Sequence, residues 1–207
     1  MKLIVLAGCN GVGKSTYGRD LIKSFLDTND FIYIDLDNVE KLIENSSNPF
    51  NVSEQVEKYF IESLKDAILN KKDFIYESNL RKNPFDDINR FTQAGYEKIL
   101  LFLTLENVDK SLERVHNRIE NEKGNYVSDE DIRENFKLGL LQLNDCFRRG
   151  EAYFNTINIF ECDNGAPLLS VSIQNKIFNY VRIMPEILKS KWTPLLQTSL
   201  ETYLLTQ

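Results

Sequence analysis

The clearest chemical signal in the chain is a glycine-rich stretch that ends in a lysine and a serine. Residues 8–15 read Gly-Cys-Asn-Gly-Val-Gly-Lys-Ser and fit the pattern G-x-x-x-x-G-K-[ST]. Glycines let the backbone turn tightly and bring its N–H groups against an anion, and a helix N-terminus favours negative charge. An apolar run precedes the stretch (Leu3–Ala7) and a helical pattern follows it (Ser15–Leu26). The sequence therefore predicts a loop that binds the phosphates of a nucleotide.

Two side chains of this loop have predicted roles beyond backbone binding. Lys14 adds a point charge that can reach the β- and γ-phosphates, and Ser15 offers a hydroxyl to Mg²⁺, which prefers a few oxygen ligands together with substrate phosphates. The predicted cofactors are ATP and Mg²⁺. The alternative is an ordinary glycine turn between a strand and a helix. The candidate nucleotide-binding residues are Gly8, Asn10, Gly11, Val12, Gly13, Lys14, Ser15 and Thr16.

Carboxylates follow two further apolar runs and are candidates for chemistry on a second substrate. Asp35 and Asp37 come at the end of the run that begins at Phe31, and Glu77 ends the run Phe74–Glu77. A carboxylate there can accept the proton of an attacking hydroxyl, hold Mg²⁺ through water, or bind substrate hydroxyls. The alternatives are that Asp37 caps the helix expected over Asn38–Glu44 and that Glu77 is a solvated loop carboxylate.

Three arginines form the remaining candidate set. Arg114 and Arg118 are four residues apart and share one face of a charged helix, and Arg133 lies in the first turn of the next helix. A cation near a helix N-terminus is unfavourable by itself, so Arg133 suggests an anionic partner. Arginines that close on a transferring phosphate accelerate phosphoryl transfer strongly. The alternative is a solvated face paired with Glu113 and Glu120.

These residues must be positioned by the elements around them, and the pattern of those elements indicates an α/β fold. Apolar runs alternate with helical patterns, which is typical of a mainly parallel sheet with helices on both faces. A sheet of this kind binds ligands at the carboxyl ends of its strands. The expected strands are Leu3–Ala7, Phe31–Asp35, Phe74–Glu77, Ile99–Leu103 and Thr156–Phe160.

Helical patterns lie between these strands. Asn51-Val-Ser-Glu54 predicts a cap for a helix to about Asn70, and Ser128–Asp131 predicts a cap for a helix to about Arg148. Shorter helices are expected over Asp86–Ala94, which Gly95 would end, and over Asn107–Glu122. Residues 107–148 are expected to form a helical lid, with a mobile polar segment over Glu120–Asp131 that contains Lys123-Gly-Asn125.

The pattern changes after Asn164-Gly165. Leu168–Ile173 and Lys176–Val181 predict an antiparallel hairpin, and Trp192-Thr-Pro194 precedes an expected helix over Leu195–Leu205. With 207 residues and no linker long enough to divide them, we expect one P-loop NTPase domain over 1–207, whose C-terminal hairpin and helix occupy about 166–207.

Composition narrows the class of partner. The net charge of −6 argues against non-specific binding to nucleic acid or to an anionic membrane surface, although it leaves room for a local basic site such as the arginine set. No apolar run is long enough to span a membrane, and Met1-Lys2 leads directly into the first strand, so we expect a cytoplasmic protein without a signal peptide. Three scattered cysteines and one histidine indicate neither a disulfide framework nor a zinc site.

Taken in chain order, these motifs resemble the zeta-toxin-like family of P-loop kinases, in particular its chromosomal branch of predicted ATPases. The resemblance covers about residues 1–165, and the block Arg114-Val-His-Asn-Arg118 with the later Ile132-Arg133 is its most specific part. It implies a kinase core with a mobile arginine lid. The family's studied members transfer the γ-phosphate of ATP to a hydroxyl of UDP-N-acetylglucosamine.

The resemblance also implies roles for several candidate residues, with Lys14 and Ser15 holding ATP and Mg²⁺. Asp37 matches the proposed base, Glu77 the contact to the sugar nucleotide, and Arg118 and Arg133 the arginines of the lid. Asn164 falls where the family keeps an Asp-Asn pair near the nucleotide. From the residue positions and the resemblance together, the expected catalytic residues are Asp37, Lys14, Arg118 and Arg133, and the expected substrate-binding residues are Asp35, Glu77 and Arg114.

Other functions remain open at this point. The acceptor is expected to be a small molecule, but it could be another hydroxylated metabolite rather than a UDP-N-acetyl sugar. A kinase of nucleic-acid ends is disfavoured by the acidic charge. A nucleotide-binding protein with little turnover, controlled by an antitoxin-like partner, is the alternative from another class.

Overall fold

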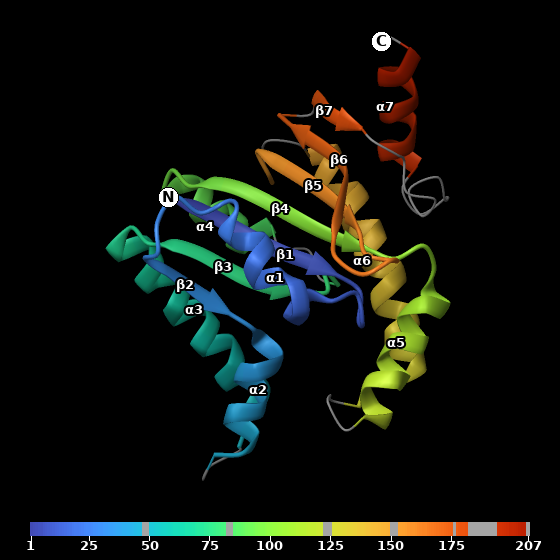
Figure 1. Ribbon diagram of the computed structural model, residues 1–207. Coiled ribbons are helices and arrows are strands. Elements are labelled where there is room, and N and C mark those ends of the chain that lie inside the picture. Colours follow the sequence, from blue (N-terminus) through green and yellow to red (C-terminus); the bar gives the residue numbers. More distant parts are fainter. Residues whose placement is uncertain are drawn as a thin grey trace.

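The computed structural model describes residues 1–46, 50–81, 85–121, 126–149, 153–175, 177–181 and 194–205. The predicted alternation of strands and helices is confirmed. The elements are β1 (Lys2–Gly8), α1 (Lys14–Lys23), β2 (Phe31–Ile34), α2 (Leu36–Glu44), α3 (Val52–Asn70), β3 (Asp73–Ser78), α4 (Phe85–Gln93), β4 (Glu97–Thr104), α5 (Val108–Glu120), α6 (Asp129–Arg149), β5 (Thr156–Glu161), β6 (Leu168–Gln174), β7 (Ile177–Val181) and α7 (Pro194–Leu205) (Figure 1). Of the expected mobile segment Glu120–Asp131, residues 122–125 lie outside the described residues, and so does Trp192.

One sheet runs through the molecule in the strand order β2-β3-β1-β4-β5-β6-β7. The first five strands in this order pair in parallel, as predicted. The strand count differs from the prediction of five because the C-terminal hairpin does not stand apart. β6 pairs antiparallel with β5, and β7 with β6, so the hairpin extends the sheet to seven strands. Burial explains the extension, since Val171 and Ile173 of β6 are buried.

Helices cover both faces of the sheet (Figure 1). On one face α1 packs so closely on β1 that a Cβ at Gly18 would lie 2.3 Å from the Leu6 side chain. On the other face α3 and α4 contribute aromatic side chains that meet those of β3, for example Phe60 and Phe91 on either side of Phe74. Side chains alternate along a strand, so residues two apart on β3 share a face.

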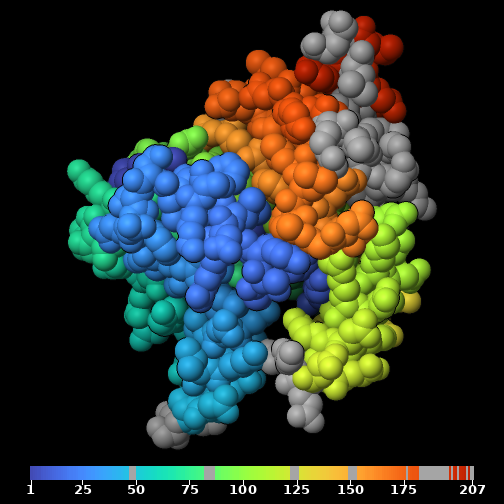
Figure 2. All heavy atoms as spheres, viewed as in Figure 1, coloured from blue at the N-terminus to red at the C-terminus, as the bar shows by residue number. Residues whose placement is uncertain are grey.

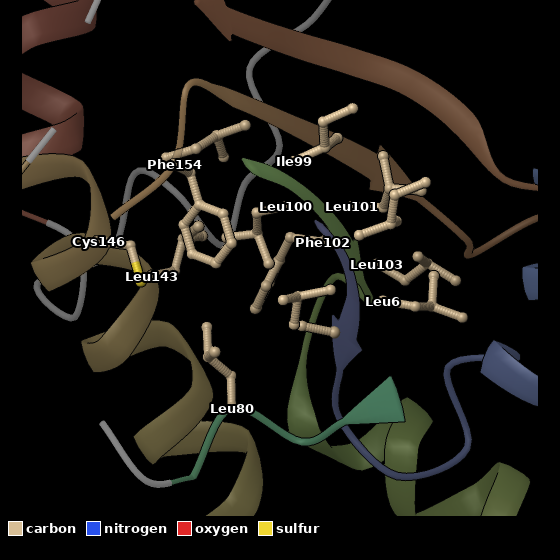
Figure 3. Close-up of a cluster of buried hydrophobic side chains, with 14 of the residues drawn as sticks. Leu6, Leu80, Ile99, Leu100, Leu101, Phe102, Leu103, Leu143, Cys146 and Phe154 are labelled. Atoms are coloured by element: carbon tan, nitrogen blue, oxygen red, sulfur yellow. The ribbon is translucent and has the colours of Figure 1, made fainter. Parts of the chain in front are cut away.

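The core around the central strands is mainly apolar, and α6 packs against it. Leu143 and Cys146 of α6 meet Leu100 and Phe102 of β4, and Leu80 points into the same cluster from the loop after β3 (Figure 3). Leu80 has a backbone φ of 52°, and its N–H bonds to the Ser78 hydroxyl. This buried anchor fixes the loop that follows β3, where several cavity residues lie.

The two predicted caps had different outcomes. Ser128 caps α6 as predicted, because its hydroxyl accepts the Asp131 N–H at 3.1 Å and donates to the Asp131 carboxylate. Asn51 is the N-cap residue of α3, as predicted, but the expected side-chain cap is absent. Asn51 adopts a left-handed conformation, its side chain makes no capping bond, and its amide donates to Glu54 instead. Gly95, at φ 77°, follows α4 as expected.

In the described part of the chain no helix is long and apolar enough to cross a membrane.

Candidate active site

The glycine-rich loop connects β1 to α1 in a conformation that needs glycine. Gly8, Gly11 and Gly13 have backbone φ angles of 149°, 71° and 104°. A Cβ at Gly8 would lie 2.4 Å from the Leu103 carbonyl oxygen, and one at Gly13 would lie 2.9 Å from the ring of Tyr17. Side chains other than hydrogen therefore cannot occupy these two positions without displacing the backbone or the first turn of α1.

Lys14 folds back over the loop. Its Nζ donates to the Gly8 carbonyl at 2.7 Å, to the Cys9 carbonyl at 3.2 Å and to the Asn79 side-chain oxygen at 2.7 Å. Three bonds match the three protons of the ammonium group. Burial lowers the pKa of Lys14, while nearby charges, including Glu77 and Asp37, act in the opposite direction.

A cavity of about 870 Å³ opens beside this loop. In Figure 2 the surface is hollowed between the blue α1–α2 side and the yellow-green α5. Predicted residues that line it are Asn10, Gly11, Val12, Gly13, Lys14, Ser15, Thr16, Asp35, Asp37, Glu77, Arg114 and Arg118. Its lining also includes Cys9, Asn38, Glu40, Lys41, Asn79, Arg81, Tyr126, Val127, Asp131 and Asn135. The carboxyl ends of β1, β2 and β3 thus converge on one hollow, as parallel strands should.

Asp35 and Asp37 occupy different positions at the start of α2. Asp35 caps this helix, because its carboxylate accepts the Asn38 N–H at 3.2 Å and the Asn38 side-chain amide at 2.6 Å. The alternative that Asp37 is the capping residue is therefore wrong. Asp37 lies in the first turn, is exposed and lines the cavity. Because Asp35 makes the cap, Asp37 has no capping role and its side chain lies at the cavity.

Glu77 ends the buried part of β3 and is itself 8 % exposed. Its carboxylate accepts a hydrogen bond from the hydroxyl of Tyr33 on β2. Burial raises the pKa of Glu77 above its usual range, the Tyr33 bond opposes that rise, and the neighbouring Asp35 adds to it. The alternative of a solvated loop carboxylate is wrong, because the side chain is buried and bonded.

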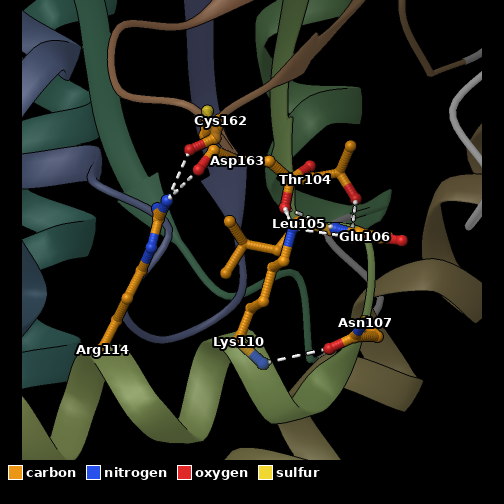
Figure 4. A network of polar contacts seen from close by, with 8 residues as sticks. All are labelled: Thr104, Leu105, Glu106, Asn107, Lys110, Arg114, Cys162 and Asp163. Carbon is orange, nitrogen blue, oxygen red and sulfur yellow. Dashed lines mark hydrogen bonds and ion pairs between the residues drawn. The ribbon is translucent and has the colours of Figure 1, made fainter.

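Arg114 lines the cavity from α5, but its guanidinium is bound to protein. It donates to the carbonyl oxygens of Cys162 at 2.7 Å and Asp163 at 3.0 Å (Figure 4). Asp163 in turn accepts from the Glu106 N–H and pairs with Lys110 at 3.2 Å. This network joins the loop after β5 to the start of α5. The guanidinium of Arg114 fixes these two segments, whereas its predicted contact to substrate stays a prediction.

Replacing Arg114 with alanine should therefore lower stability. We expect a loss of roughly 1.5–3 kcal/mol in the free energy of unfolding, the range for hydrogen bonds to charged groups. Denaturant unfolding followed by circular dichroism measures it. Glu113→Ala, an exposed change on the same helix, is the matched control. Equal midpoints for the two variants would contradict this role.

The other predicted residues divide between the cavity and its surroundings. Arg118 lines the cavity from α5. Arg133 lies outside the lining, with its Nη1 3.6 Å from an Asp109 carboxylate oxygen. Asn164 is exposed and also lies outside the lining, and so does Gly8, whose carbonyl holds Lys14. Their predicted roles stay predictions.

Several cavity residues were missed in the sequence. Asn79 stands just beyond the β1–β3 pairing, which ends at Ala7 and Ser78, so strand register could have placed it beside Gly8. Asn135 of α6 donates to the Asn10 side chain at 2.9 Å, and Ser111 of α5 donates to the Asn10 carbonyl at 2.6 Å. Both helices therefore hold the loop at Asn10. Only tertiary packing shows these contacts.

Arg81 is another cation of the cavity that the sequence did not single out. Its guanidinium lies 2.8 Å from a Glu134 carboxylate oxygen and 4.0 Å from one of Asp131, so it connects the loop after β3 to α6.

Cys9 also lines the cavity, but its thiol is unreactive. Burial raises the pKa of its thiol to about 11, which keeps it protonated despite its position near a helix N-terminus.

Mg²⁺ fits this site through substrate phosphates rather than through a protein cage. Ser15 is exposed at the cavity, and the carboxylates of Asp35 and Asp37 are near enough to share the lining. Across the described residues, no group of three or more His, Cys, Asp or Glu side chains is arranged to hold a metal. Such sparse protein ligation is usual for Mg²⁺ bound with a nucleotide.

The strand order, the glycine loop after β1 and the helix that begins Lys14-Ser15 define a P-loop NTPase of the kinase-like type. The family described as zeta toxin matches residues 2–169, which is most of the chain. The chain belongs to the zeta toxin family, as its motifs predicted. No curated protein sequence matches the chain.

Solved structures share the fold at low identity. One belongs to the PezAT chromosomal toxin–antitoxin system of Streptococcus pneumoniae, at 16 % identity and a TM-score of 0.50, covering 98 % of this chain and 87 % of that one. A crystal structure of AvrRxo1-ORF1:-ORF2 with ATP gives 13 % identity and a TM-score of 0.62, covering 93 % and 63 %. The Pnkp1/Rnl/Hen1 RNA repair complex gives 18 % and 0.50, covering 70 % and 45 %. At such identities the likeness establishes the fold.

Proposed function

We propose that this protein is an ATP-dependent kinase that transfers the γ-phosphate to a hydroxyl of a small molecule, with UDP-N-acetyl sugars as the first acceptor class to test. One observation supports this most strongly: the phosphate loop and the carboxylates Asp37 and Glu77 line the same cavity. A P-loop alone binds a nucleotide, whereas carboxylates opposite it give a second substrate a place to bind and react. Family membership supports the same proposal.

On this proposal the reaction depends on position and charge. The backbone N–H groups of the loop and Lys14 hold the phosphates, and Asp37 accepts the proton of the acceptor hydroxyl as that oxygen attacks the γ-phosphorus. Mg²⁺, when bound, supplies charge neutralisation at the phosphate oxygens, with Ser15 among its ligands. Glu77 binds a further hydroxyl of the acceptor.

Arginines complete the charge balance on this proposal. Arg118 already lines the cavity. Arg133 would leave Asp109 to reach the phosphates. Breaking this ion pair would cost little free energy, because both side chains are exposed and their charged atoms are 3.6 Å apart. The bond between the γ-phosphorus and the bridging oxygen of ATP breaks as the phosphoryl group joins the acceptor oxygen. ADP keeps the bridging oxygen, and Lys14 neutralises the negative charge that develops there.

A panel assay of ADP release tests the proposed function. We expect turnover with Mg²⁺ and ATP to rise at least tenfold over the acceptor-free rate when the correct hydroxylated acceptor is added, and ³¹P NMR to show a new phosphate ester. UDP-N-acetylglucosamine, UDP-N-acetylgalactosamine, UDP and free sugars separate the sugar and nucleotide requirements. The Lys14→Ala protein, prepared in parallel, controls for contaminating ATPase.

Two outcomes would redirect the assignment. Turnover with an unrelated metabolite but not with UDP-sugars would keep the kinase and reject that acceptor class. ATP binding without turnover on any acceptor would instead support a nucleotide-binding protein under the control of a partner. An antitoxin-like protein is a proposed partner, since a structural neighbour comes from a toxin–antitoxin system.

A further inference from the structure

A tyrosine outside the cavity lining contacts one of the cavity's carboxylates. Tyr33 lies on β2, the edge strand next to β3, and pairs with Ile75. Glu77 is two residues beyond Ile75, so Tyr33 and Glu77 point from the same face of the sheet. The hydroxyl of Tyr33 donates to Oε1 of Glu77. This bond spans two strands at the point where both approach the cavity.

The ring of Tyr33 is held from its other side. The guanidinium carbon of Arg19, on α1, lies 5.7 Å from the ring centroid, within the range of a cation–π contact. Burial, together with the Glu77 bond, raises the pKa of the Tyr33 hydroxyl, so it keeps its proton and remains a donor throughout the working pH range. Tyr33 is thus a fixed hydrogen-bond donor aimed at one carboxylate.

Glu77 has charged neighbours of both signs. Asp35, which precedes α2, and Asp37, in its first turn, raise the pKa of Glu77, while Lys14 of α1 lowers it. Burial has the largest effect, and it also raises the pKa of Glu77. The hydrogen bond from Tyr33 is the largest of the effects that lower this pKa. The Tyr33 donor therefore favours the ionised form of Glu77, against its burial and the two aspartates.

We propose that Tyr33 is a positioning residue that holds Glu77 in the orientation in which it binds a hydroxyl of the acceptor. This inference rests on the proposed kinase function. Tyr33 fixes Oε1 of Glu77, and the other carboxylate oxygen accepts from the acceptor. The tyrosine itself touches neither substrate, since it lies outside the cavity lining.

Tyr33→Phe tests the inference, because it removes the donor and keeps the ring under Arg19. We expect the KM for the acceptor to rise roughly threefold to tenfold, the effect of one hydrogen bond of ordinary net strength, because Tyr33 acts on the acceptor only through Glu77; the KM for ATP should not change. Loss of a donor to the ionised form raises the pKa of Glu77. The acid limb of kcat/KM for the acceptor should therefore move to higher pH.

Tyr96→Phe is the matched control. Its hydroxyl bonds to the carbonyl oxygens of Ala67 and Lys72, away from the cavity, so this variant should lose stability without moving the pH profile. A Tyr33→Phe enzyme with wild-type acceptor KM and acid limb would overturn the proposal. So would equal changes in the KM values of ATP and acceptor.

A titration of the Glu77 carboxyl by ¹³C NMR, assigned with Glu77→Gln, separates this inference from the kinase assignment. It needs no turnover. An unshifted Glu77 titration in Tyr33→Phe overturns the positioning role even in an active kinase. A shifted titration in a protein that phosphorylates no acceptor supports the Tyr33–Glu77 coupling and counts against the kinase function.

Discussion

Lys14→Ala should reduce ATP-dependent phosphorylation to the background rate, a loss of at least roughly 10²–10³-fold, because the removal of one preorganised charge stabiliser costs that much by itself. The ammonium group lies over the glycine loop, bound to the Gly8 and Cys9 carbonyls. Nucleotide affinity should fall as well, since the same group neutralises phosphate charge before and during transfer. ADP release and calorimetric titration with ATP measure the two effects.

Lys23→Ala is the matched control for this prediction. Lys23 lies in the last turn of the same helix, is exposed and pairs with Asp20, so its loss should leave binding and turnover at the wild-type level. Circular dichroism checks that both variants remain folded. Nucleotide binding that survives unchanged in Lys14→Ala would show that the phosphates bind elsewhere.

The second large effect is expected at Asp37. Replacement with alanine should lower kcat by roughly 10²–10⁴-fold, the contribution of general-base assistance, while the affinity for ATP is spared. The reason is position: Asp37 lines the cavity from α2, whereas the phosphate loop lies between β1 and α1. Single-turnover kinetics at saturating ATP and acceptor measures the chemical step apart from binding.

Asp35→Ala separates this effect from a loss of helix stability. Asp35 is the capping residue of α2, so its removal should cost about 1 kcal/mol in the free energy of unfolding. Asp37→Ala should change stability by less, because Asp37 makes no capping bond. If Asp37→Ala retained the wild-type kcat, the base would have to be another carboxylate of the cavity, and Glu77 would be the next to test.

The sequence was sufficient for the framework of this fold. The run from Leu3 to Ala7 and the glycines after it predict β1 and its loop, and the periodicity around them predicts the remaining strands and helices. What could not be predicted is how the hairpin attaches. β6 and β7 read as a separate unit along the chain, because an antiparallel extension depends on pairing with β5 and leaves no local signal.

The candidate site was predictable to the extent that strand ends reveal it. Asp37 and Glu77 follow apolar runs, and parallel strands bring such ends together. Asn79, Arg81 and Asn135 were missed because their positions depend on side-chain contacts across elements: Asn79 with Lys14, Arg81 with Glu134, and Asn135 with Asn10. Arg114 is the opposite case. The sequence predicted that it contacts substrate, whereas in the structure its guanidinium donates to backbone carbonyls.

The two sides of the cavity are anchored unequally. The phosphate loop continues a strand whose side chains from Leu3 to Ala7 are all fully buried, whereas α2 contains no buried residue although it carries Asp37 and Lys41. Regions with little buried apolar surface open at lower free energy than the core. The wall that would meet the acceptor can therefore yield to molecules of different shape, while the wall that would grip the triphosphate stays constant. On the proposed function, acceptor preference can change during evolution through α2, while Glu77 on β3 and the nucleotide pocket stay in place.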